Sequence, residues 1–337
     1  MSGKKLGIVL PSGGTRGIIT SKLLEEINGR VIKLALEAGK QFKGISAADY
    51  FGGTSIGSIM VGAIANDNIP EDITNIFKDN TGKILKKTSF LPIRVSYYSS
   101  ENLEKILSEK IGEKTLGEAE KKILITSYNL ERSQQTTFTN FGSEAERQKL
   151  PGYAWGIDKI KLKDAVQSSS AVPGLFSSKE IEYAIDASGV KKYHEIDGAM
   201  QNNSPVMDLV LAMNSLEKVN FKDMFILSIG TGILKKDEME KIKDKGVVGN
   251  IFSGKDIAVG HLCAVQEAAE NQAKLLLETY GGKFFKIDPE VSVDEFCSAL
   301  DDSKKQMDKY EKIADDYISM NDDYLNEVAA ELVEYCL

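Results

Sequence analysis

The feature that most constrains this chain is an uncharged run, Tyr50–Ala65, which contains the pattern Gly-x-Ser-x-Gly around Ser55. This pattern is typical of a nucleophile elbow, in which a strand turns sharply into a helix and holds a serine in a strained backbone conformation. Small residues must flank the serine because other backbone comes close, and Gly53 and Gly57 provide that room. The helix would begin near Ile56, so its free N–H groups would face negative charge developing beside the serine.

Other interpretations of this run have to be considered. Gly-x-Ser-x-Gly is short and also occurs by chance in glycine-rich loops, so alone it is a weak signal. A membrane-spanning helix needs ~20 apolar residues, and the run Tyr50–Ala65 is shorter than that. A buried core helix is the structural alternative, and the rest of the chain has to decide between it and a catalytic serine.

The overall composition restricts the class of protein. With 337 residues, 42% of them hydrophobic, the chain is globular and long enough to bury a large core. Its net charge of -8 argues against nucleic acid as the main partner and against loose adhesion to anionic lipid, so any membrane contact must be local. The three cysteines are widely spaced and only two histidines are present, so we expect no metal site and no cofactor.

The start of the chain and the cysteines bear on the compartment. The apolar run Leu6–Leu10 is too short for the core of a signal peptide. An odd number of separated cysteines is typical of a reducing compartment. We therefore expect a cytoplasmic protein that contacts membranes transiently and has no transmembrane segment.

Hydrophobic spacing predicts alternating strands and helices along the chain. Leu6–Leu10 is a buried strand, and after a glycine loop a helix continues to a stop at Gly39. Ser204 is expected to cap a helix that begins at Pro205. The order of elements indicates an α/β protein. The other strands are predicted at 122–128, 136–141, 225–232 and 283–287, and the other helices at 100–111, 164–176, 257–280 and 294–337.

The glycine loop Gly13–Gly17 follows the first strand directly. Its order of glycines fits neither the dinucleotide fingerprint nor the phosphate loop that ends in Gly-Lys-Ser/Thr. It does provide a row of unhindered backbone N–H groups, which can bind an oxyanion or a phosphate. The alternative is an ordinary tight turn between a strand and a helix.

One stretch, Thr81–Tyr98, combines basic and apolar residues in an otherwise acidic protein. It is either an ordinary helix end and loop with solvated lysines, or a surface that contacts lipid near the mouth of an active site. Its basic residues are Lys83, Lys86, Lys87 and Arg94.

Three separated motifs together resemble the signature of one family. Gly13-Gly14-Thr15-Arg16-Gly17, Gly53-Thr54-Ser55-Ile56-Gly57 and Asp197-Gly198-Ala199 resemble, in this order, the three blocks of the patatin-like phospholipases. The similarity extends to 168–176, 228–232 and, more loosely, 300–318, so it covers nearly the whole chain. It implies a bacterial-type, single three-layer α/β domain with a central, mostly parallel sheet flanked by helices. The catalytic domain would span 5–290, with C-terminal helices at 291–337 packed on it.

The resemblance also implies a function. In the family, catalysis uses a Ser-Asp dyad, so Ser55 would attack an ester carbonyl while Asp197 accepts its proton and later activates water. An aspartate with the ordinary pKa of about 3.9 is a weak base, so burial in an apolar pocket would have to raise the pKa. The loop Gly13–Gly17, above all the N–H groups of Gly13 and Gly14, would form the oxyanion hole. The substrate would be a phospholipid at a membrane surface.

Two positions in the glycine loop carry specific expectations. The family's loop usually has three consecutive glycines, and here Ser12 occupies the first position. A positive φ at that position would strain the loop. Arg16 would either bind a lipid phosphate or brace the loop through carbonyl groups, and we favour bracing because the loop's own N–H groups would hold the oxyanion.

Two alternative functions remain open. A different α/β serine esterase or acyltransferase would complete a Ser-His-Asp triad with His194 or His261. A catalytically silent protein would use the glycine loop to bind an anion, although the intact Ser55 and Asp197 argue against this. The sequence does not identify a regulatory ligand or a partner protein.

Overall fold

The computed structural model describes residues 3–41, 43–84, 98–186, 189–235, 254–297, 301 and 303–336. Both strands and helices are distributed along these residues. The strands are β1 (Lys5–Leu10), β2 (Tyr50–Thr54), β3 (Lys122–Asn129), β4 (Gln134–Thr139), β5 (Lys179–Tyr183), β6 (Lys191–Asp197), β7 (Met224–Ile229), β8 (Ile233–Leu234), β9 (Lys283–Ile287) and β10 (Glu290–Val291). The α-helices are α1 (Gly17–Glu37), α2 (Ile56–Ala65), α3 (Pro70–Ile84), α4 (Ser100–Lys110), α5 (Glu144–Arg147), α6 (Leu162–Ser169), α7 (Val206–Glu217), α10 (Gly254–Tyr280), α11 (Val293–Cys297), α12 (Lys304–Met320) and α13 (Asp322–Cys336).

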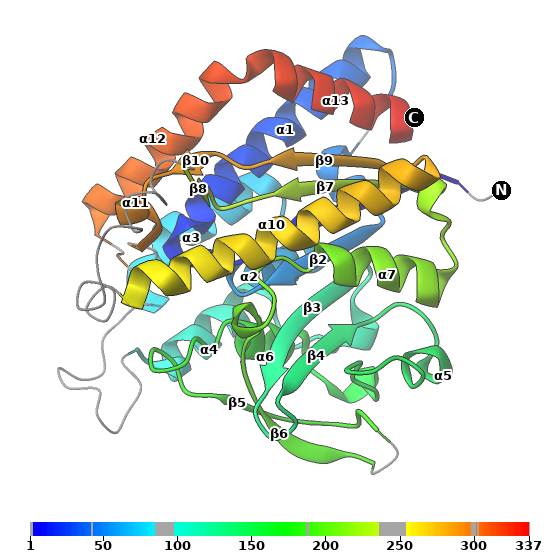
Figure 1. Ribbon diagram of the computed structural model, residues 1–337, viewed down its shortest axis with the longest axis vertical. Helices are drawn as coiled ribbons and strands as arrows, with labels where there is room; N and C mark the ends of the chain where they lie inside the picture. The colour runs from blue at the N-terminus through cyan, green and yellow to red at the C-terminus, as the bar shows by residue number, and fades with distance from the viewer. Residues whose placement is uncertain are drawn as a thin grey trace.

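A single large sheet organises the fold. Its strand order is β5-β6-β3-β2-β1-β7-β9, and β4 pairs with β3 as well. β1, β2, β3, β7 and β9 are parallel, whereas β4 and β6 pair antiparallel with β3, and β5 with β6. Figure 1 shows α7 and α10 on one face of the sheet and α1, α12 and α13 on the other. The predicted α/β architecture with a central, mostly parallel sheet flanked by helices is therefore confirmed.

Both faces of the sheet are buried. Leu6, Ile8 and Leu10 of β1 belong to the core cluster that includes α1 and α2, whereas Val9 belongs to the cluster formed with α7 and α10. Side chains of a strand alternate between faces, so a strand covered on both sides needs apolar residues at every position. This explains the uncharged run Leu6–Leu10 within β1.

The C-terminal helices pack on the outer side of α1. Tyr310 of α12 and Leu325 of α13 lie in the same buried cluster as Leu23 of α1. Ion pairs at the rim of this contact join Lys22 of α1 to Asp315 of α12, and Arg30 of α1 to Asp322 of α13. Exposed ion pairs contribute little, so apolar burial holds these helices in place. The domain boundary expected at residue 290 stays a prediction.

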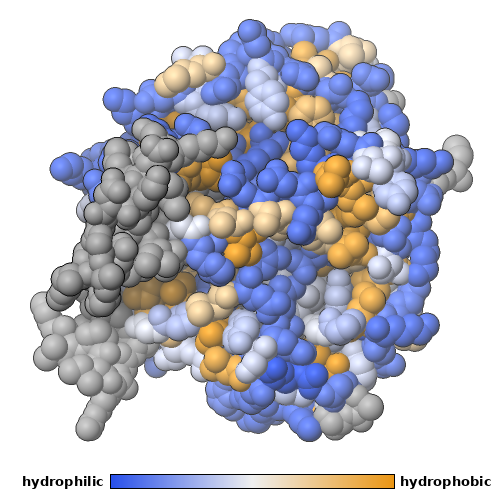
Figure 2. Space-filling view, in the orientation of Figure 1, coloured by the Kyte–Doolittle hydropathy of each residue, from blue (hydrophilic) through white to orange (hydrophobic). Residues whose placement is uncertain are grey.

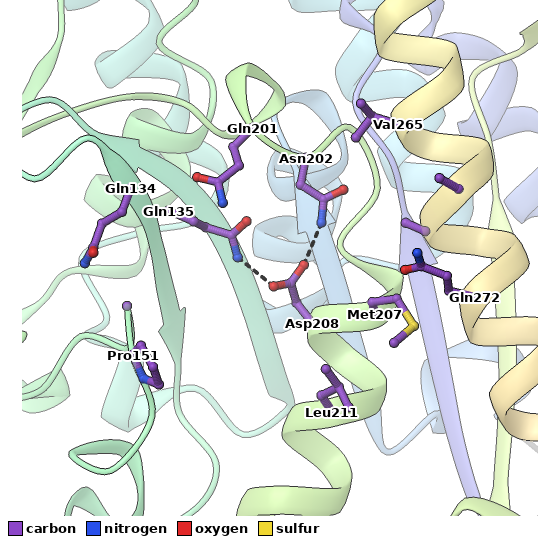
Figure 3. A pocket seen from close by; sticks show the side chains of 13 residues that line it. Gln134, Gln135, Pro151, Gln201, Asn202, Met207, Asp208, Leu211, Val265 and Gln272 are labelled. Carbon is purple, nitrogen blue, oxygen red and sulfur yellow. Dashed lines mark hydrogen bonds between the residues drawn. The ribbon is translucent and has the colours of Figure 1, made fainter.

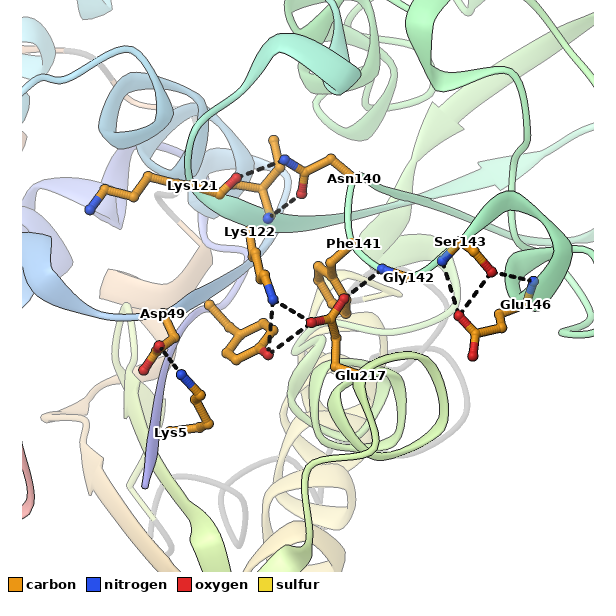
Figure 4. Close-up of polar contacts among 12 residues, drawn as sticks. Lys5, Asp49, Lys121, Lys122, Asn140, Phe141, Gly142, Ser143, Glu146 and Glu217 are labelled. Atoms are coloured by element: carbon orange, nitrogen blue, oxygen red, sulfur yellow. Dashed lines mark hydrogen bonds and ion pairs between the residues drawn. The ribbon is translucent and has the colours of Figure 1, made fainter. Parts of the chain in front are cut away.

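Glu217, the last residue of α7, lies at the end of the sheet where β2 and β3 begin. Glu217 accepts a hydrogen bond from the Gly142 N–H at 2.7 Å and from the Lys122 ammonium (Figure 4). The same ammonium lies 5.0 Å above the ring of Tyr50. These contacts join α7 to the first residues of β2 and β3.

Several predicted details differ in the structure. Asp197 is the last residue of β6, a strand that the hydrophobic spacing did not predict. Pro205 occupies the N-cap position of α7, and the buried Ser204 hydroxyl has no hydrogen-bond partner among the described residues, so the expected serine cap is wrong. The continuous helical region predicted from residue 294 consists of α11, α12 and α13.

The surface shows no continuous apolar face on the side drawn in Figure 2, where hydrophobic residues lie in separate groups among hydrophilic ones. None of the described helices combines the length and the low polarity that crossing a bilayer requires. Of the stretch Thr81–Tyr98, residues 85–97 and the side chains of 81–84 lie outside the described part of the structure. Its contact with lipid stays a prediction.

Candidate active site

Ser55 sits at the sharp turn between β2 and α2, with φ 54° and ψ −122°. A non-glycine residue at such a backbone conformation costs on the order of 1–3 kcal/mol, so the surroundings must hold it. A Cβ atom on Gly53 would lie 2.6 Å from the Gly57 carbonyl oxygen, and one on Gly57 would overlap the Leu10 carbonyl oxygen. Both glycines of the Gly-x-Ser-x-Gly pattern are therefore required for close backbone packing.

Two serines of α6 and its C-terminus support the strained turn. The Ser169 hydroxyl accepts a hydrogen bond from the Ser55 N–H at 2.9 Å and donates to the Thr126 carbonyl at 2.7 Å. The Ser170 hydroxyl donates to the Ser55 carbonyl at 3.2 Å. The sequence predicted a helix over 164–176 but not this supporting role, which depends on contacts with Ser55 and β3 that a local pattern does not reveal.

The strand register brings Asp197 to Ser55. β4 pairs with one edge of β3 over Leu124–Asn129. On the other edge, β2 pairs with Lys122–Thr126 of β3, and β6 pairs with Ser127–Asn129. β2 and β6 therefore meet end to end along the same edge of β3. The residue after β2 is Ser55 and the last residue of β6 is Asp197, so the two side chains meet where the strands end.

The serine and the aspartate are directly hydrogen-bonded. The Ser55 hydroxyl donates to Asp197 Oδ2 at 2.6 Å, and the Ala199 N–H donates to Asp197 Oδ1 at 2.8 Å. Ser55 is 5% and Asp197 2% exposed. A Cβ on Gly198 would overlap the Thr126 carbonyl oxygen, so only glycine lets the chain turn here beside β3. The Asp-Gly-Ala motif thus fixes both the position of the carboxylate and one of its hydrogen bonds.

Burial changes the acidity of this carboxyl group. Removal from water disfavours the charged form and raises the pKa of Asp197 to about 7, against the opposing effect of the hydrogen bonds from Ser55 and Ala199. A base with a pKa near neutrality can both accept a proton and return it at physiological pH. The sequence-based requirement that burial raise the pKa of this aspartate is met.

The two histidines lie elsewhere. His194 Nδ1 is 2.7 Å from Glu131 Oε1, and its side chain is half exposed on β6. His261 is exposed on α10. In the part of the chain that the structure describes, the Ser55 hydroxyl is bonded to Asp197 and to neither histidine.

The glycine loop lies beside the elbow because β1 and β2 are neighbouring parallel strands. Gly14 has φ 59°, whereas Ser12 is not among the residues with positive φ, so the serine causes no strain. The Arg16 N–H donates to the Gly13 carbonyl, and the Gly17 N–H to the carbonyls of Gly14 and Thr15. These two amides are occupied within the loop. Among the described residues, the N–H groups of Gly13 and Gly14 have no protein acceptor.

Arg16 points away from the serine and braces the loop. Its Nη1 donates to the Gly232 carbonyl at 2.9 Å, and its guanidinium carbon lies 3.5 Å from the ring centroid of Phe296. The residue is 2% exposed. The bracing role favoured from the sequence is therefore the one that these contacts support.

The segment between Asp197 and α7 is also held by hydrogen bonds close to the start of α7. Asp208 at the start of α7 accepts hydrogen bonds from Asn202 at 2.8 Å and from Gln135 of β4 at 2.6 Å (Figure 3). These residues line a groove of about 560 Å³ between β4, α7 and α10, whose lining includes neither Ser55 nor Asp197. Within the described residues, no group of three or more His, Cys, Asp or Glu side chains is placed to bind a metal ion.

The fold and the site define an α/β protein with a serine at a strained strand-to-helix turn and a buried aspartate as its partner. A sequence model described as patatin-like phospholipase matches residues 8–210, which is more than half of the chain. The chain belongs to the patatin-like phospholipase family.

Individual relatives are distant. Patatin-16 of Solanum tuberosum is 26% identical over 257 residues, which cover 66% of this chain and 59% of that protein. Patatin-like protein 1 of Arabidopsis thaliana is 25% identical over 265 residues, which cover 69% of this chain and 60% of that protein. The chain thus spans about 60% of the length of these relatives.

Solved structures with similarity to this chain have low sequence identity. VipD from Legionella pneumophila is 13% identical with a TM-score of 0.44, over 93% of this chain and 67% of that one. Human GIVD cytosolic phospholipase A2 is 9% identical with a TM-score of 0.49, over 99% of this chain and 63% of that one. Family membership rests on the sequence match over residues 8–210.

Proposed function

We propose that the protein is a lipid acyl hydrolase of the phospholipase A or lysophospholipase type, which cleaves carboxylic esters through a Ser55–Asp197 dyad. The observation that carries the proposal is the 2.6 Å hydrogen bond from the Ser55 hydroxyl to a buried carboxyl group. A nucleophile in hydrogen-bond contact with a base is the arrangement that nucleophilic catalysis requires. The raised pKa of Asp197, about 7, makes this carboxylate a competent base near neutrality.

The first half of the reaction forms an acyl-enzyme. Ser55 Oγ attacks the ester carbonyl while its proton passes to Asp197 Oδ2. The negative charge that develops on the carbonyl oxygen would be bound by the N–H groups of Gly13 and Gly14. When the tetrahedral intermediate collapses, Asp197 returns the proton to the departing alcohol, and the acyl group stays on Ser55.

The second half of the reaction releases the fatty acid. Asp197, ionised again, takes a proton from a water molecule, which attacks the acyl carbonyl. The same two N–H groups would stabilise the second oxyanion, and the proton returns to Ser55 as the free acid leaves. Loss of one such donor typically costs on the order of 10²–10³ in rate, so the glycine loop is expected to contribute strongly to turnover.

The substrate proposed is a phospholipid presented at a membrane surface, which a cytoplasmic enzyme would contact peripherally. Support comes from the family match and from the negative net charge of -8, which leaves membrane contact to a local surface. The stretch Thr81–Tyr98, with its four basic residues, is the proposed contact region.

The proposal is tested by product analysis and active-site labelling. The parent protein should release free fatty acid from a mixed phospholipid extract, detected by mass spectrometry, and should react with a fluorophosphonate probe at Ser55. Ser55→Ala should do neither while keeping its circular dichroism spectrum. A catalytically silent, anion-binding protein is the conclusion if the folded parent is neither labelled nor active, and equal turnover by Ser55→Ala would exclude this serine as the nucleophile.

A second prediction separates the dyad from a triad. His194→Ala and His261→Ala should each keep most of the parent turnover, because neither imidazole is bonded to the Ser55 hydroxyl. The measurement is kcat and KM on a soluble short-chain ester. Removal of a triad histidine typically costs ~10³-fold or more, so a loss of that size with the fold intact would assign the base to a histidine.

A further inference from the structure

The peptide that joins Ser12 to Gly13 is held by a segment far away in sequence. The Thr231 hydroxyl, on the turn after β7, donates to the Ser12 carbonyl at 2.8 Å. Both groups are buried, with Thr231 1% and Ser12 7% exposed. The Ser12 N–H is also held, since it donates to the Asn203 carbonyl at 2.9 Å. Neither backbone polar group of Ser12 is therefore free to turn.

The planarity of the peptide carries this constraint to Gly13. The Ser12 carbonyl and the Gly13 N–H belong to one planar, trans peptide, in which the two bonds point in opposite directions. A donor that fixes the carbonyl therefore also fixes the direction of the N–H on the other side. The Gly13 carbonyl is fixed in the same way by the Arg16 N–H at 3.2 Å, which orients the Gly14 N–H.

The turn that carries Thr231 is itself rigidly held. The Gly230 N–H donates to the Ile287 carbonyl at 2.8 Å, and the Gly232 N–H donates to Asp288 Oδ1 at 2.7 Å. The other oxygen of the Asp288 carboxylate accepts from Gln266 at 3.1 Å. Anchored at the residues on either side, Thr231 keeps its hydroxyl in one position.

Close packing against this threonine explains the glycine at position 13. A Cβ atom on Gly13 would overlap the Thr231 side chain. The contact with Thr231 leaves no room for a side chain at this position, where the backbone has φ 171° and ψ 4°. The threonine and the glycine thus form one unit that sets where the N–H points.

We propose that Thr231 is a positioning residue, which orients the Gly13 N–H toward the developing oxyanion by holding the Ser12 carbonyl on the other side of the peptide. This inference rests on the proposed function, because it assumes that Gly13 is an oxyanion donor. Thr231 touches no reacting atom. It acts through the Ser12–Gly13 peptide, so its contribution belongs to the transition state and not to substrate binding.

The test compares Thr231→Val, which keeps the shape but removes the hydroxyl, with Thr231→Ser, which keeps the hydroxyl. On a soluble short-chain ester, kcat of Thr231→Val should fall ~10- to 100-fold, somewhat less than for complete loss of a donor, with KM within about threefold of the parent. Thr231→Ser should stay within about threefold of the parent kcat. A general structural defect would instead lower kcat in both variants or raise KM.

A matched control removes an equivalent bond outside the glycine loop and the turn that carries Thr231. Thr139 is also fully buried, and its hydroxyl donates to the Ile123 carbonyl at 2.8 Å. Thr139→Val should lose a similar amount of thermal stability as Thr231→Val while keeping kcat within about threefold of the parent. A kcat of Thr231→Val that equals that of Thr139→Val overturns the inference while leaving the proposed hydrolase intact.

A second readout does not depend on turnover. Labelling with carbonyl-¹³C serine and ¹⁵N glycine selects the Ser-Gly peptides of the chain, which are 2–3, 12–13, 188–189 and 253–254. The Gly13 amide signal, identified by its loss in Ser12→Ala, should shift or broaden in Thr231→Val and keep its position in Thr231→Ser. If the parent cleaves no ester, the proposed function is wrong. An unchanged Gly13 signal in Thr231→Val would instead show that the threonine does not orient this peptide.

Discussion

Asp197→Asn is expected to lose at least ~10³-fold in ester turnover, because an amide cannot accept the Ser55 proton. The shape of the site should survive. The amide oxygen can accept from the Ala199 N–H and the amide nitrogen can face Ser55 Oγ, in place of the two hydrogen bonds that the carboxylate accepts. In the parent, kcat/KM should rise with pH through the raised pKa of Asp197, about 7, since the ionised form is the base.

The same substitution should stabilise the fold, and more so at high pH. The folded pKa of Asp197 is raised from 3.8 to about 7, so the unfolded chain ionises first as pH rises. Below pH ~4 both states are protonated and burial of this group carries no charge penalty. The free-energy cost of keeping this carboxyl group buried grows between pH 4 and 7 and reaches its full value above pH 7. By linkage it amounts to about 2 kcal/mol at pH 5 and about 4 kcal/mol at pH 8, and Asp197→Asn removes it.

Denaturant unfolding at pH 5 and pH 8 measures this difference. Asp197→Asn should exceed the parent in the free energy of unfolding at both values, by the wider margin at pH 8. Ser55→Ala is the matched control, because it is equally inactive but keeps the carboxyl group, so its stability should still decline with pH as in the parent. A stability margin that does not change with pH would mean that Asp197 is ionised at an ordinary pKa in the fold.

Gly57→Ala is expected to disrupt the elbow. Alanine is normally favoured over glycine within a helix, by about 1 kcal/mol. Here the added Cβ would overlap the Leu10 carbonyl oxygen and lie 2.9 Å from that of Pro11, and backbone atoms of a central strand cannot move aside. We expect a loss on the order of 3 kcal/mol or more in the free energy of unfolding. Displacement of α2 should also lower kcat ~10²-fold, since Ser55 moves relative to the glycine loop.

Gly29→Ala gives the comparison for this effect. Gly29 lies inside α1, and a Cβ there meets no other atom within 4 Å. The Gly29→Ala substitution should therefore raise the free energy of unfolding by about 0.5–1 kcal/mol and leave turnover unchanged. Both variants are measured by denaturant unfolding and by kcat on the same ester. If Gly57→Ala behaves like Gly29→Ala, the close approach of α2 to β1 does not constrain this position.

The sequence predicted the buried parallel strands best. β9 has the predicted bounds Lys283–Ile287, and β1 and β7 lie where apolar runs indicated them. β1 and β7 are covered on both faces, so their sequences are almost entirely apolar, whereas β9 lies at the edge of the sheet and is only partly buried. β6, with the sequence Lys-Lys-Tyr-His-Glu-Ile-Asp, was not predicted as a strand. It lies toward the outer side of the sheet, and its first two residues are exposed, so no apolar run marks it.

What the sequence alone determined about this protein is local. The spacing of Gly53, Ser55 and Gly57 predicts the elbow, because the tight turn and the close packing involve residues next to the serine. The glycines after β1 likewise predict a loop with unhindered N–H groups. These features arise from backbone geometry over a few consecutive residues, so the sequence alone predicts them.

The tertiary structure decided which of these features act together. Asp197 reaches Ser55 because β2 and β6 meet end to end along one edge of β3, and that register depends on pairing between distant strands. The pKa of about 7 follows from burial beneath elements that the motif does not contain. The Thr231 hydroxyl contacts Ser12 across β1 and β7, which are neighbours only in the folded sheet. Distance and desolvation are properties of the packed chain, so no local pattern could supply them.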